Sequence, residues 1–430
     1  MSPDAGTDLT DPGRPGPPTP GPPTPGPPGP PELGPPGPPT PGPPTPHPEP
    51  RTTEPRTTEP PATEPAAQPG PGGPRWCRVT RLVLAGTAGW LAFVLLHLGL
   101  SGRFWLWLLP DALPPIAFLA VPALLAATVP ALRLLRRPMP RRARRLVAAG
   151  AAIALVLGAG SAGLNLHALA PAGAVRPDAI RVFAWNTEYW DQTDDPDRFY
   201  RFLAGQRADV YVLQEHLNWD MAAGDDGARP LDDTDRLRRA FPGYHLAARG
   251  ELLTLSRFPI LARPPVGPDR FLPPTARYRD VVSAARVLRT DLDVGGRPLS
   301  VYNVHIPVQF SLEPSRILGR LAGRDAARRQ QFGGLLADLA GNPLPVLVAG
   351  DFNTSPAMGD LAGLRGRLVD ATPANRSLYP VSWDASGWLR LWRLDWAFTS
   401  RAVQVQRYEF VDPAGLSDHR GQRLLLHLAG

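Results

Sequence analysis

Lysine is missing from this sequence, and cysteine occurs only once. We attribute the absence of lysine to biased composition, and all 46 basic residues are therefore arginines. The one thiol, at Cys77, excludes a disulfide within the chain and argues against a zinc site built from cysteines. Any bound metal is thus expected to be held by oxygen and imidazole ligands.

The C-terminal part also has little net charge. From residue 178 onward, 31 arginines oppose 30 aspartates and glutamates, whereas the whole chain carries a formal charge of +7. Because proteins that bind duplex DNA normally gather cations at the interface, this balance argues against nucleic acid as a partner. The excess positive charge lies upstream, beside apolar segments, where it marks membrane topology.

Composition divides the chain into three parts. Residues 1–74 repeat PGPPTPGPPTPGPP and have too little apolar surface to form a core, which predicts a disordered tail rich in Pro and Gly. We interpret the tail as a spacer, with binding of a cytoplasmic partner as the alternative. Residues 75–175 are apolar with basic interruptions. Residues 178–430 have the composition of a globular domain that is long enough to bury a sizeable core.

Residues 75–175 predict a transmembrane anchor with about three helices. The segments Leu82–Leu100, Leu113–Leu132 and Leu146–Leu169 are uncharged and long enough to cross a bilayer, although four prolines weaken the second one. Seven arginines between the second and third segments place this loop and the tail in the cytoplasm by the positive-inside rule. Three crossings then leave residues 178–430 outside the plasma membrane. If the proline-rich segment does not cross, they lie in the cytoplasm.

Strand-like and helix-like patterns alternate through residues 178–430. Helices are predicted at Pro196–Ala208 and Ala326–Leu339. The predicted strands are Ile180–Trp185, Val210–Gln214, Leu252–Leu255, Ala284–Leu292, Leu299–Ile306, Pro345–Ala349, Leu394–Phe398 and Arg423–Leu426. Many strands with interspersed helices in one domain indicate a layered α/β or α+β fold.

Polar side chains recur where these apolar strands end. They are Asn186, Glu215, His305, Asp351, Asn353, Asp395, Asp418 and His419. Strand ends on one edge of a sheet can converge even when they are far apart in sequence. Their carboxylate and amide oxygens suit a hard cation such as Mg²⁺ or Mn²⁺, which can neutralise the charge of a phosphoryl group.

Six short motifs contain these residues. They are WN at 185–186, QE at 214–215, NVH at 303–305, GDFN at 350–353, LDWAF at 394–398 and SDH at 417–419. In this order they resemble the endonuclease/exonuclease/phosphatase superfamily, which includes DNase I-like nucleases, inositol-polyphosphate phosphatases and neutral sphingomyelinases. The resemblance covers essentially all of residues 178–430 and implies a four-layer α/β sandwich of two packed β-sheets flanked by helices.

The resemblance also implies catalytic roles. Asp351 would position or activate the water, and Asn353 would contact the phosphate. Asp395 would orient His419, which would stabilise the transition state. His305 would be a second phosphate donor or an acid.

The same resemblance implies a metal site. Glu215 would be the main ligand of Mg²⁺ or Mn²⁺, with Asn186 beside it. Asp418 would bind or approach a metal ion.

Two further residues are candidates for substrate binding. Asn303 shares a strand face with His305 and could point into the same cleft. Arg257 could meet an anionic substrate, with a solvated surface position as the alternative. Trp383 could form an apolar lip of the cleft or belong to the core.

The layout of anchor and domain resembles the actinobacterial VanJ-like proteins linked to teicoplanin resistance. We therefore expect a membrane-anchored hydrolase of a lipid-linked pyrophosphate, such as undecaprenyl pyrophosphate. An extracellular nuclease and a phospholipid phosphodiesterase are the enzymatic alternatives. A membrane sensor that keeps the fold without the activity is the non-enzymatic one.

The arginine cluster at 133–145 generates a prediction about topology. Alkaline phosphatase fused to the C-terminus should be active, because that enzyme folds only outside the cytoplasm, whereas a fusion within 133–145 should be inactive. Measuring phosphatase activity of matched fusions in whole cells tests this. The reverse pattern of activity would rule out the outward-facing arrangement.

Overall fold

The computed structural model describes residues 76–171, 173–190, 195–220, 222–223, 227–309, 317–384 and 390–429. The predicted disordered tail therefore lies outside the described residues. The chain divides into the units Met1–Pro71 and Gly72–Gly430, and every described element belongs to the second unit.

Three helices form the segment that the sequence predicts to be an anchor, called the anchor segment from here on. They are α1 (Arg78–Leu100), α2 (Ala117–Leu134) and α3 (Arg141–Gly158). Each is long and apolar enough to cross a membrane. Large apolar side chains stand on their outer faces, since Leu82 is 72% exposed and Val156 is 77% exposed. An apolar surface of this kind is unfavourable in water and suits contact with lipid.

The second and third helices differ in extent from the predicted segments. α2 begins at Ala117 because paired prolines at 114 and 115 restrict the residues before them to extended conformations. Pro122 and Pro130 lie inside α2, yet the helix continues through both. α3 begins at Arg141, before the predicted segment. The prediction excluded the charged residues because they do not lie in lipid, but arginine is a good helix former and the helix includes them. It ends at Gly158, where glycines recur.

Two six-stranded sheets form the C-terminal domain, residues 178–430. The order of the first sheet is β13 (Val403–Val411), β14 (Gly421–Leu428), β1 (Ile180–Asn186), β2 (Val210–Gln214), β6 (Leu252–Ser256) and β5 (His245–Arg249). The order of the second is β11 (Val369–Asp370), β12 (Asp395–Thr399), β10 (Val346–Asp351), β9 (Arg297–His305), β8 (Val287–Val294) and β7 (Ile260–Ala262). In each sheet one inner pair is parallel, β1 with β2 and β9 with β10, and the other pairs are antiparallel.

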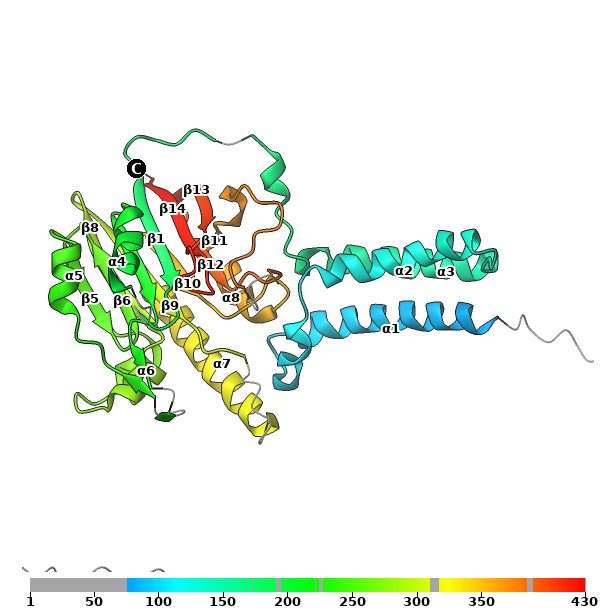
Figure 1. The fold of residues 1–430 in the computed structure, drawn as a ribbon, viewed down its shortest axis with the longest axis horizontal. Coiled ribbons are helices and arrows are strands. Elements are labelled where there is room, and N and C mark those ends of the chain that lie inside the picture. Colours follow the sequence, from blue (N-terminus) through cyan, green and yellow to red (C-terminus); the bar gives the residue numbers. More distant parts are fainter. Residues whose placement is uncertain are drawn as a thin grey trace, which may run out of the picture. The chain divides into compact units, whose positions relative to one another are not determined.

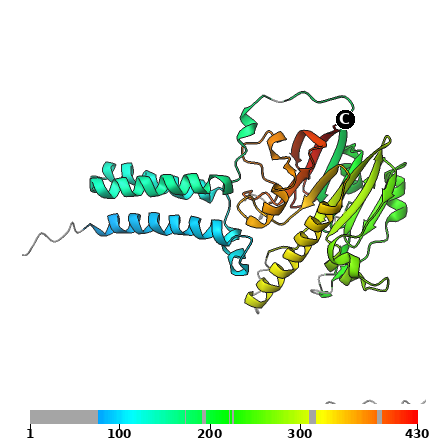
Figure 2. The same ribbon diagram turned by 180° about the vertical axis from the view of Figure 1, so that it is seen from behind.

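Alternate residues of the inner strands pack into different layers. Val182 and Ala184 of β1 face the second sheet, whereas Phe183 and Trp185 face the helices outside the first. Those helices are α4 (Pro196–Gly205) and α5 (Thr234–Ala240). The outer face of the second sheet packs against α7 (Ile317–Gly341) and α8 (Ala362–Arg365). The domain is therefore the four-layer sandwich that the resemblance implies, as Figure 1 and, from behind, Figure 2 show.

Each of the eight inner strands overlaps one of the eight predicted strands, although β8 begins at Val287 and not at Ala284, which ends α6 (Tyr278–Ala284). The four edge strands β13, β5, β11 and β7 have no counterpart in the prediction. An inner strand is buried on both faces and reads as an apolar run. An edge strand such as β13, VQVQRYEFV, is only partly covered and carries polar residues throughout. Its sequence therefore lacks the pattern by which the inner strands are recognised.

The pairing of the inner strands gathers their ends on one edge. Asn186 at the end of β1 pairs with Gln214 at the end of β2. Asp351 at the end of β10 pairs with His305 on one side and with Asp395 on the other. Because β12 and β14 run antiparallel to these strands, their first residues lie at the same edge.

The anchor segment is bonded to the C-terminal domain at several points. The backbone N–H of Asn165, in the connection after α3, donates to the carbonyl of Leu378 at 2.8 Å. The side-chain amide of Asn165 donates to the carbonyl of Asn375 at 2.7 Å. In α1, Nε2 of His97 lies 2.8 Å from the carbonyl of Ala357. These bonds hold the domain directly against the ends of the apolar helices.

Candidate active site

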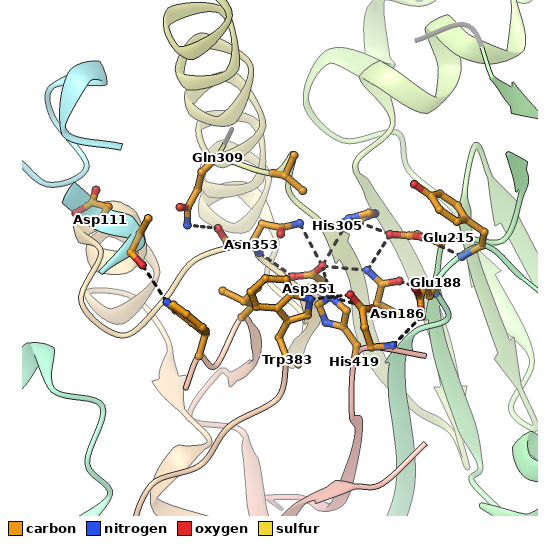
Figure 3. A pocket seen from close by; sticks show the side chains of 16 residues that line it. Asp111, Asn186, Glu188, Glu215, His305, Gln309, Asp351, Asn353, Trp383 and His419 are labelled. Carbon is orange, nitrogen blue, oxygen red and sulfur yellow. Dashed lines mark hydrogen bonds and ion pairs between the residues drawn. The ribbon is translucent and has the colours of Figure 1, made fainter. Parts of the chain in front are cut away.

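A pocket of about 490 Å³ opens at the edge where the inner strands end, and Figure 3 shows its lining. The residues predicted from strand ends that line it are Asn186, Glu215, His305, Asp351, Asn353, Asp418 and His419. Asp395, the remaining one, lies fully buried against His419. The structure thus brings all eight residues into one region.

His419 and Asp395 form the first of two imidazole–carboxylate pairs. Nδ1 of His419 lies 2.8 Å from Oδ2 of Asp395. Burial by itself lowers the pKa of His419, but the charges of Asp395 and Asp351 outweigh it and raise that pKa well above its usual value. Asp351, Asp395 and His419 could also hold a metal ion, since each offers a ligand atom within 4.8 Å of the others. Nδ1 and Oδ2 are, however, already bonded to each other.

The second pair includes Glu251, which the sequence analysis did not identify. Nδ1 of His305 lies 2.9 Å from Oε1 of Glu251, which also accepts a hydrogen bond from Arg286. Burial by itself raises the pKa of Glu251, but the charges of Arg286 and His305 lower it below its usual value. Glu251 follows Gly250 in the turn between β5 and β6, where a lone glutamate normally indicates a solvated position. Its sequence therefore gave no signal of a buried role.

Both imidazoles point their other nitrogen toward Asp351. Nε2 of His305 lies 3.6 Å from Oδ2 of Asp351, and Nε2 of His419 lies 3.7 Å from the same oxygen. Because the Nδ1 atoms are held by Glu251 and Asp395, the Nε2 atoms are the ones available to a substrate. Oδ2 of Asp351 thus lies between two imidazoles, each of which is held at Nδ1 by another carboxylate.

Glu215 and Asn186 adjoin this group. Nδ2 of Asn186 donates to Oε1 of Glu215 at 3.0 Å and to Oδ2 of Asp351 at 3.0 Å. The other carboxylate oxygen of Glu215 accepts the backbone N–H of Tyr189 at 3.0 Å. Glu215 adopts a positive φ of 61°, a conformation that non-glycine residues rarely adopt and that the surrounding bonds maintain.

The donor set fits a divalent cation. Three buried carboxylates, Glu251, Asp351 and Asp395, and the partly exposed Glu215 gather beside the guanidinium of Arg286 and the two imidazoles. Burial raises the pKa of Glu215, which means that its ionised form lacks full compensation. Hard oxygen ligands with excess negative charge are what Mg²⁺ and Mn²⁺ prefer. An amide can present its oxygen as readily as its nitrogen, so Asn186 can serve as a ligand beside Glu215.

A buried arginine holds the backbone of the loop that follows β10. Asn353 has a positive φ of 46°, and its amide donates to the carbonyl of Ile306 at 2.9 Å and to Oδ2 of Asp351 at 3.2 Å. Arg328 of α7 is 0% exposed and donates to the carbonyls of Asn353 and Pro307 at 3.1 and 2.7 Å. This arginine therefore fixes the backbone that carries Asp351 and Asn353.

Asp418 lies at the rim of the pocket. Its Oδ2 accepts a hydrogen bond from the indole of Trp383 at 2.7 Å, and its backbone N–H donates to Glu188 at 2.8 Å. Oδ1 lies 3.9 Å from Nε2 of His419. Trp383 itself lines the pocket, in keeping with the lip interpretation.

The two predicted substrate-binding residues lie elsewhere. Asn303 is 0% exposed, and its amide donates to the carbonyls of Leu213 and Leu253 between the sheets. Asn303 does lie on the same face of β9 as His305. It precedes His305 by two residues, however, and therefore lies about 7 Å farther from the edge where the strand ends, where the first sheet covers it. Arg257 follows β6, which runs antiparallel to β2, so it emerges at the edge opposite Glu215 and pairs with Asp209.

A match to a family model identifies the domain. The model of the endonuclease/exonuclease/phosphatase family matches residues 183–419. The chain belongs to this family. The matched span includes all the pocket residues that the C-terminal domain contributes. Family members are phosphoesterases and nucleases and typically use divalent cations, which agrees with the carboxylate cluster.

Several solved structures are similar to this chain. A protein of the same family from Leptotrichia buccalis C-1013-b is 18% identical, with 58% of this chain and 100% of that chain covered and a TM-score of 0.40. The mannosyl-6-phosphatase of Bacteroides thetaiotaomicron VPI-5482 is 16% identical over 58% and 100% of the two chains, with a TM-score of 0.40. A beta toxin of Staphylococcus aureus is 14% identical over 57% and 99%, with a TM-score of 0.39. A search of curated proteins gave no match.

The carboxylate cluster generates a prediction about metal dependence. Chelation with EDTA should abolish phosphoester hydrolysis, and Mg²⁺ or Mn²⁺ should restore it, because excess negative charge in the pocket repels an anionic substrate. Binding can be measured separately as a rise in melting temperature when Mg²⁺ is added. That rise should be lost in Glu215→Gln. Full activity after exhaustive chelation would contradict this assignment.

The convergence on Asp351 generates a second prediction. Asp351→Asn and His419→Ala should each lower kcat by about 10²- to 10⁴-fold, because each removes water activation or charge stabilisation. His427→Ala is the matched control, since His427 lies on β14 outside the pocket. It should change kcat by less than about twofold. Equal losses in all three variants, accompanied by lower melting temperatures, would indicate a stability effect instead.

Proposed function

We propose that this protein is a membrane-anchored hydrolase of phosphate esters or anhydrides that uses Mg²⁺ or Mn²⁺. The observation that carries the proposal is the pair of buried imidazole–carboxylate couples whose Nε2 atoms flank Oδ2 of Asp351. Such an arrangement surrounds a phosphoryl group with one acceptor for water and two donors for phosphate oxygens.

Each residue has a defined part in the proposed reaction. Asp351 accepts a proton from the attacking water and orients it in line with the leaving group. His305 and His419, protonated and held at Nδ1, donate from Nε2 to the phosphoryl oxygens as negative charge grows there. Asn353 contacts the phosphate from the same wall of the pocket.

Glu215 and Asn186 would hold the cation, with Asp418 near its edge. When bound, the cation neutralises charge on the phosphate and polarises it for attack. The charges of Glu251 and Asp351 raise the pKa of His305 above its usual value, although burial by itself lowers that pKa.

We further propose that the substrate is a lipid-linked pyrophosphate of the outer leaflet, such as undecaprenyl pyrophosphate. The support is the position of the domain at the end of the three apolar helices. α3 begins at Arg141 and ends at Gly158, about 27 Å of helix later, so the arginine loop and the domain lie at opposite ends of it. The positive-inside rule then places the domain outside the cell.

A layout similar to that of the VanJ-like proteins suggests a role in tolerance of glycopeptides such as teicoplanin. Hydrolysis of the pyrophosphate would return the carrier lipid to use. The nuclease alternative is disfavoured by the near-neutral domain, in which 31 arginines oppose 30 acidic residues. A phospholipid phosphodiesterase shares the same chemistry and is distinguished by experiment. The complete set of imidazoles and carboxylates argues against an inactive sensor.

Tethering generates a prediction about substrate preference. A domain fixed to the bilayer meets lipid substrates at a high effective concentration, whereas soluble DNA gains nothing from the anchor segment. In proteoliposomes, kcat/KM for undecaprenyl pyrophosphate should exceed that for duplex DNA at least about tenfold. Phosphate release, phospholipid cleavage and DNA cleavage are measured in parallel, with Asp351→Asn as the inactive control.

The outcomes separate the candidate functions. Cleavage of phospholipid without release of phosphate from the pyrophosphate would favour the phosphodiesterase. Rapid cleavage of DNA alone would favour the nuclease. In cells, overexpression of the wild type should raise tolerance to drugs that trap lipid-linked wall intermediates, and Asp351→Asn should abolish that gain.

A further inference from the structure

The catalytic pocket is not built by the C-terminal domain alone. Asp111 and Ala112, in the short helix Pro110–Ala112 of the connection between α1 and α2, also line it. Figure 3 shows Asp111 across the pocket from Glu215 and His305. The anchor segment therefore contributes one wall of the cleft in which the proposed reaction takes place.

This wall is fixed by close backbone packing. A Cβ on Gly359 would lie 2.3 Å from the carbonyl oxygen of Ser101, and one on Gly102 would lie 2.7 Å from the carbonyl carbon of Gly359. Only glycines at both positions allow the anchor segment and the domain to approach so closely. The Ser101 hydroxyl accepts the N–H of Gly359 at 2.9 Å and donates to Oδ1 of Asp111 at 2.8 Å. The connection is thereby held as a rigid part of the domain.

Buried charges link the wall to the catalytic loop. Asp111 is 1% exposed, and burial raises its pKa to about 7, with Asp360 and Arg328 as its charged neighbours. Arg328 binds Asp360 at 3.2 Å and also binds the carbonyl of Asn353 at 3.1 Å. The same arginine thus lies beside the wall formed by the anchor segment and beneath the loop that carries Asp351.

The pocket is lined by both polar and apolar residues. The polar ones include the imidazoles and carboxylates that surround Asp351. Apolar and aromatic residues also line the pocket, namely Ala112, Val308, Trp383, Trp392 and Leu394. The indole of Trp392 donates to the carbonyl of Ala112 at 3.2 Å, and the rings of Trp383 and Trp392 meet edge to face at 5.8 Å. Trp392 therefore contacts the connection between α1 and α2 directly, and Trp383 packs behind it.

We propose that the α1–α2 connection, through Ala112 and the tryptophans it holds, receives the apolar chain of the substrate and so selects lipid-borne over soluble phosphates. This inference rests on the proposed hydrolase function and adds the element that determines chain specificity. An amphiphile can place its phosphate at Asp351 and its first methylene groups against the apolar lining residues. From there the chain reaches the membrane beside the helices without crossing water.

A matched pair of substrates tests this selection. Undecaprenyl pyrophosphate and the short-chain geranyl pyrophosphate have the same pyrophosphate head group and differ in their prenyl chains. With full-length protein in proteoliposomes, the wild type should favour the long chain in kcat/KM. Ala112→Glu places a charge among the apolar lining residues and should lower the long-to-short ratio of kcat/KM at least about tenfold.

Two further variants serve as an independent test and as a control. Trp392→Ala removes apolar surface from the facing wall and should lower the ratio in the same direction, which covers the case that Ala112→Glu does not fold. Ala248→Glu is the matched control, because Ala248 is exposed on β5 away from the pocket. It should leave the ratio unchanged. Melting temperatures in detergent report the folding of each variant.

The outcomes distinguish this inference from the proposed function. Equal losses on both substrates in Ala112→Glu and Trp392→Ala, in folded protein, would overturn the selection by chain. Hydrolysis of both substrates by the wild type without preference would overturn it as well and leave the hydrolase function standing. Hydrolysis of neither substrate by the wild type would refute the proposed pyrophosphate substrate itself.

Discussion

The negative charge of the carboxylates in the pocket is the main constraint on this domain, because it must be balanced by cations or hydrogen-bond donors. Glu251, Asp351 and Asp395 are buried in one cleft beside the partly exposed Glu215, and each ionised group there is destabilised unless a cation or a hydrogen-bond donor faces it. The imidazoles and Arg286 supply part of the compensation. The negative charge that remains fits a divalent cation. Binding of the cation would then stabilise the folded cleft as well as support activity.

Each imidazole–carboxylate pair joins the two sheets. His419 precedes β14 of the first sheet and binds Asp395 of the second, whereas His305 of the second sheet binds Glu251 beside β6 of the first. The pairs therefore fasten the sheets at the edge where the strands end. Catalytic geometry and sheet packing depend on the same contacts, so a shift of one sheet against the other would separate Asp351 from Nε2 of His419 and His305 from Glu251.

The anchor segment has more than an attachment role in this arrangement. The connection between α1 and α2 is bonded to the domain through Ser101 and Ala112, and Asn165 is bonded to the domain after α3. Because Asp111 and Ala112 of this connection line the pocket, the anchor segment and the domain build the pocket together.

The sequence by itself determined the inner strands and the polar residues at their ends, because strands buried on both faces require apolar runs and the chemistry sits where those runs stop. It identified the region of the site through residues such as Glu215 and Asp351. Only the tertiary structure decided how deeply each polar side chain is buried and which residues it contacts. Asn303 occupies the predicted face but lies beneath the other sheet, and Glu251 lies in a turn that looks solvated until Arg286 and His305 close over it. Likewise, no local pattern marks Ala112 as a pocket residue, because its role exists only when the anchor segment packs against a domain that begins far along the chain.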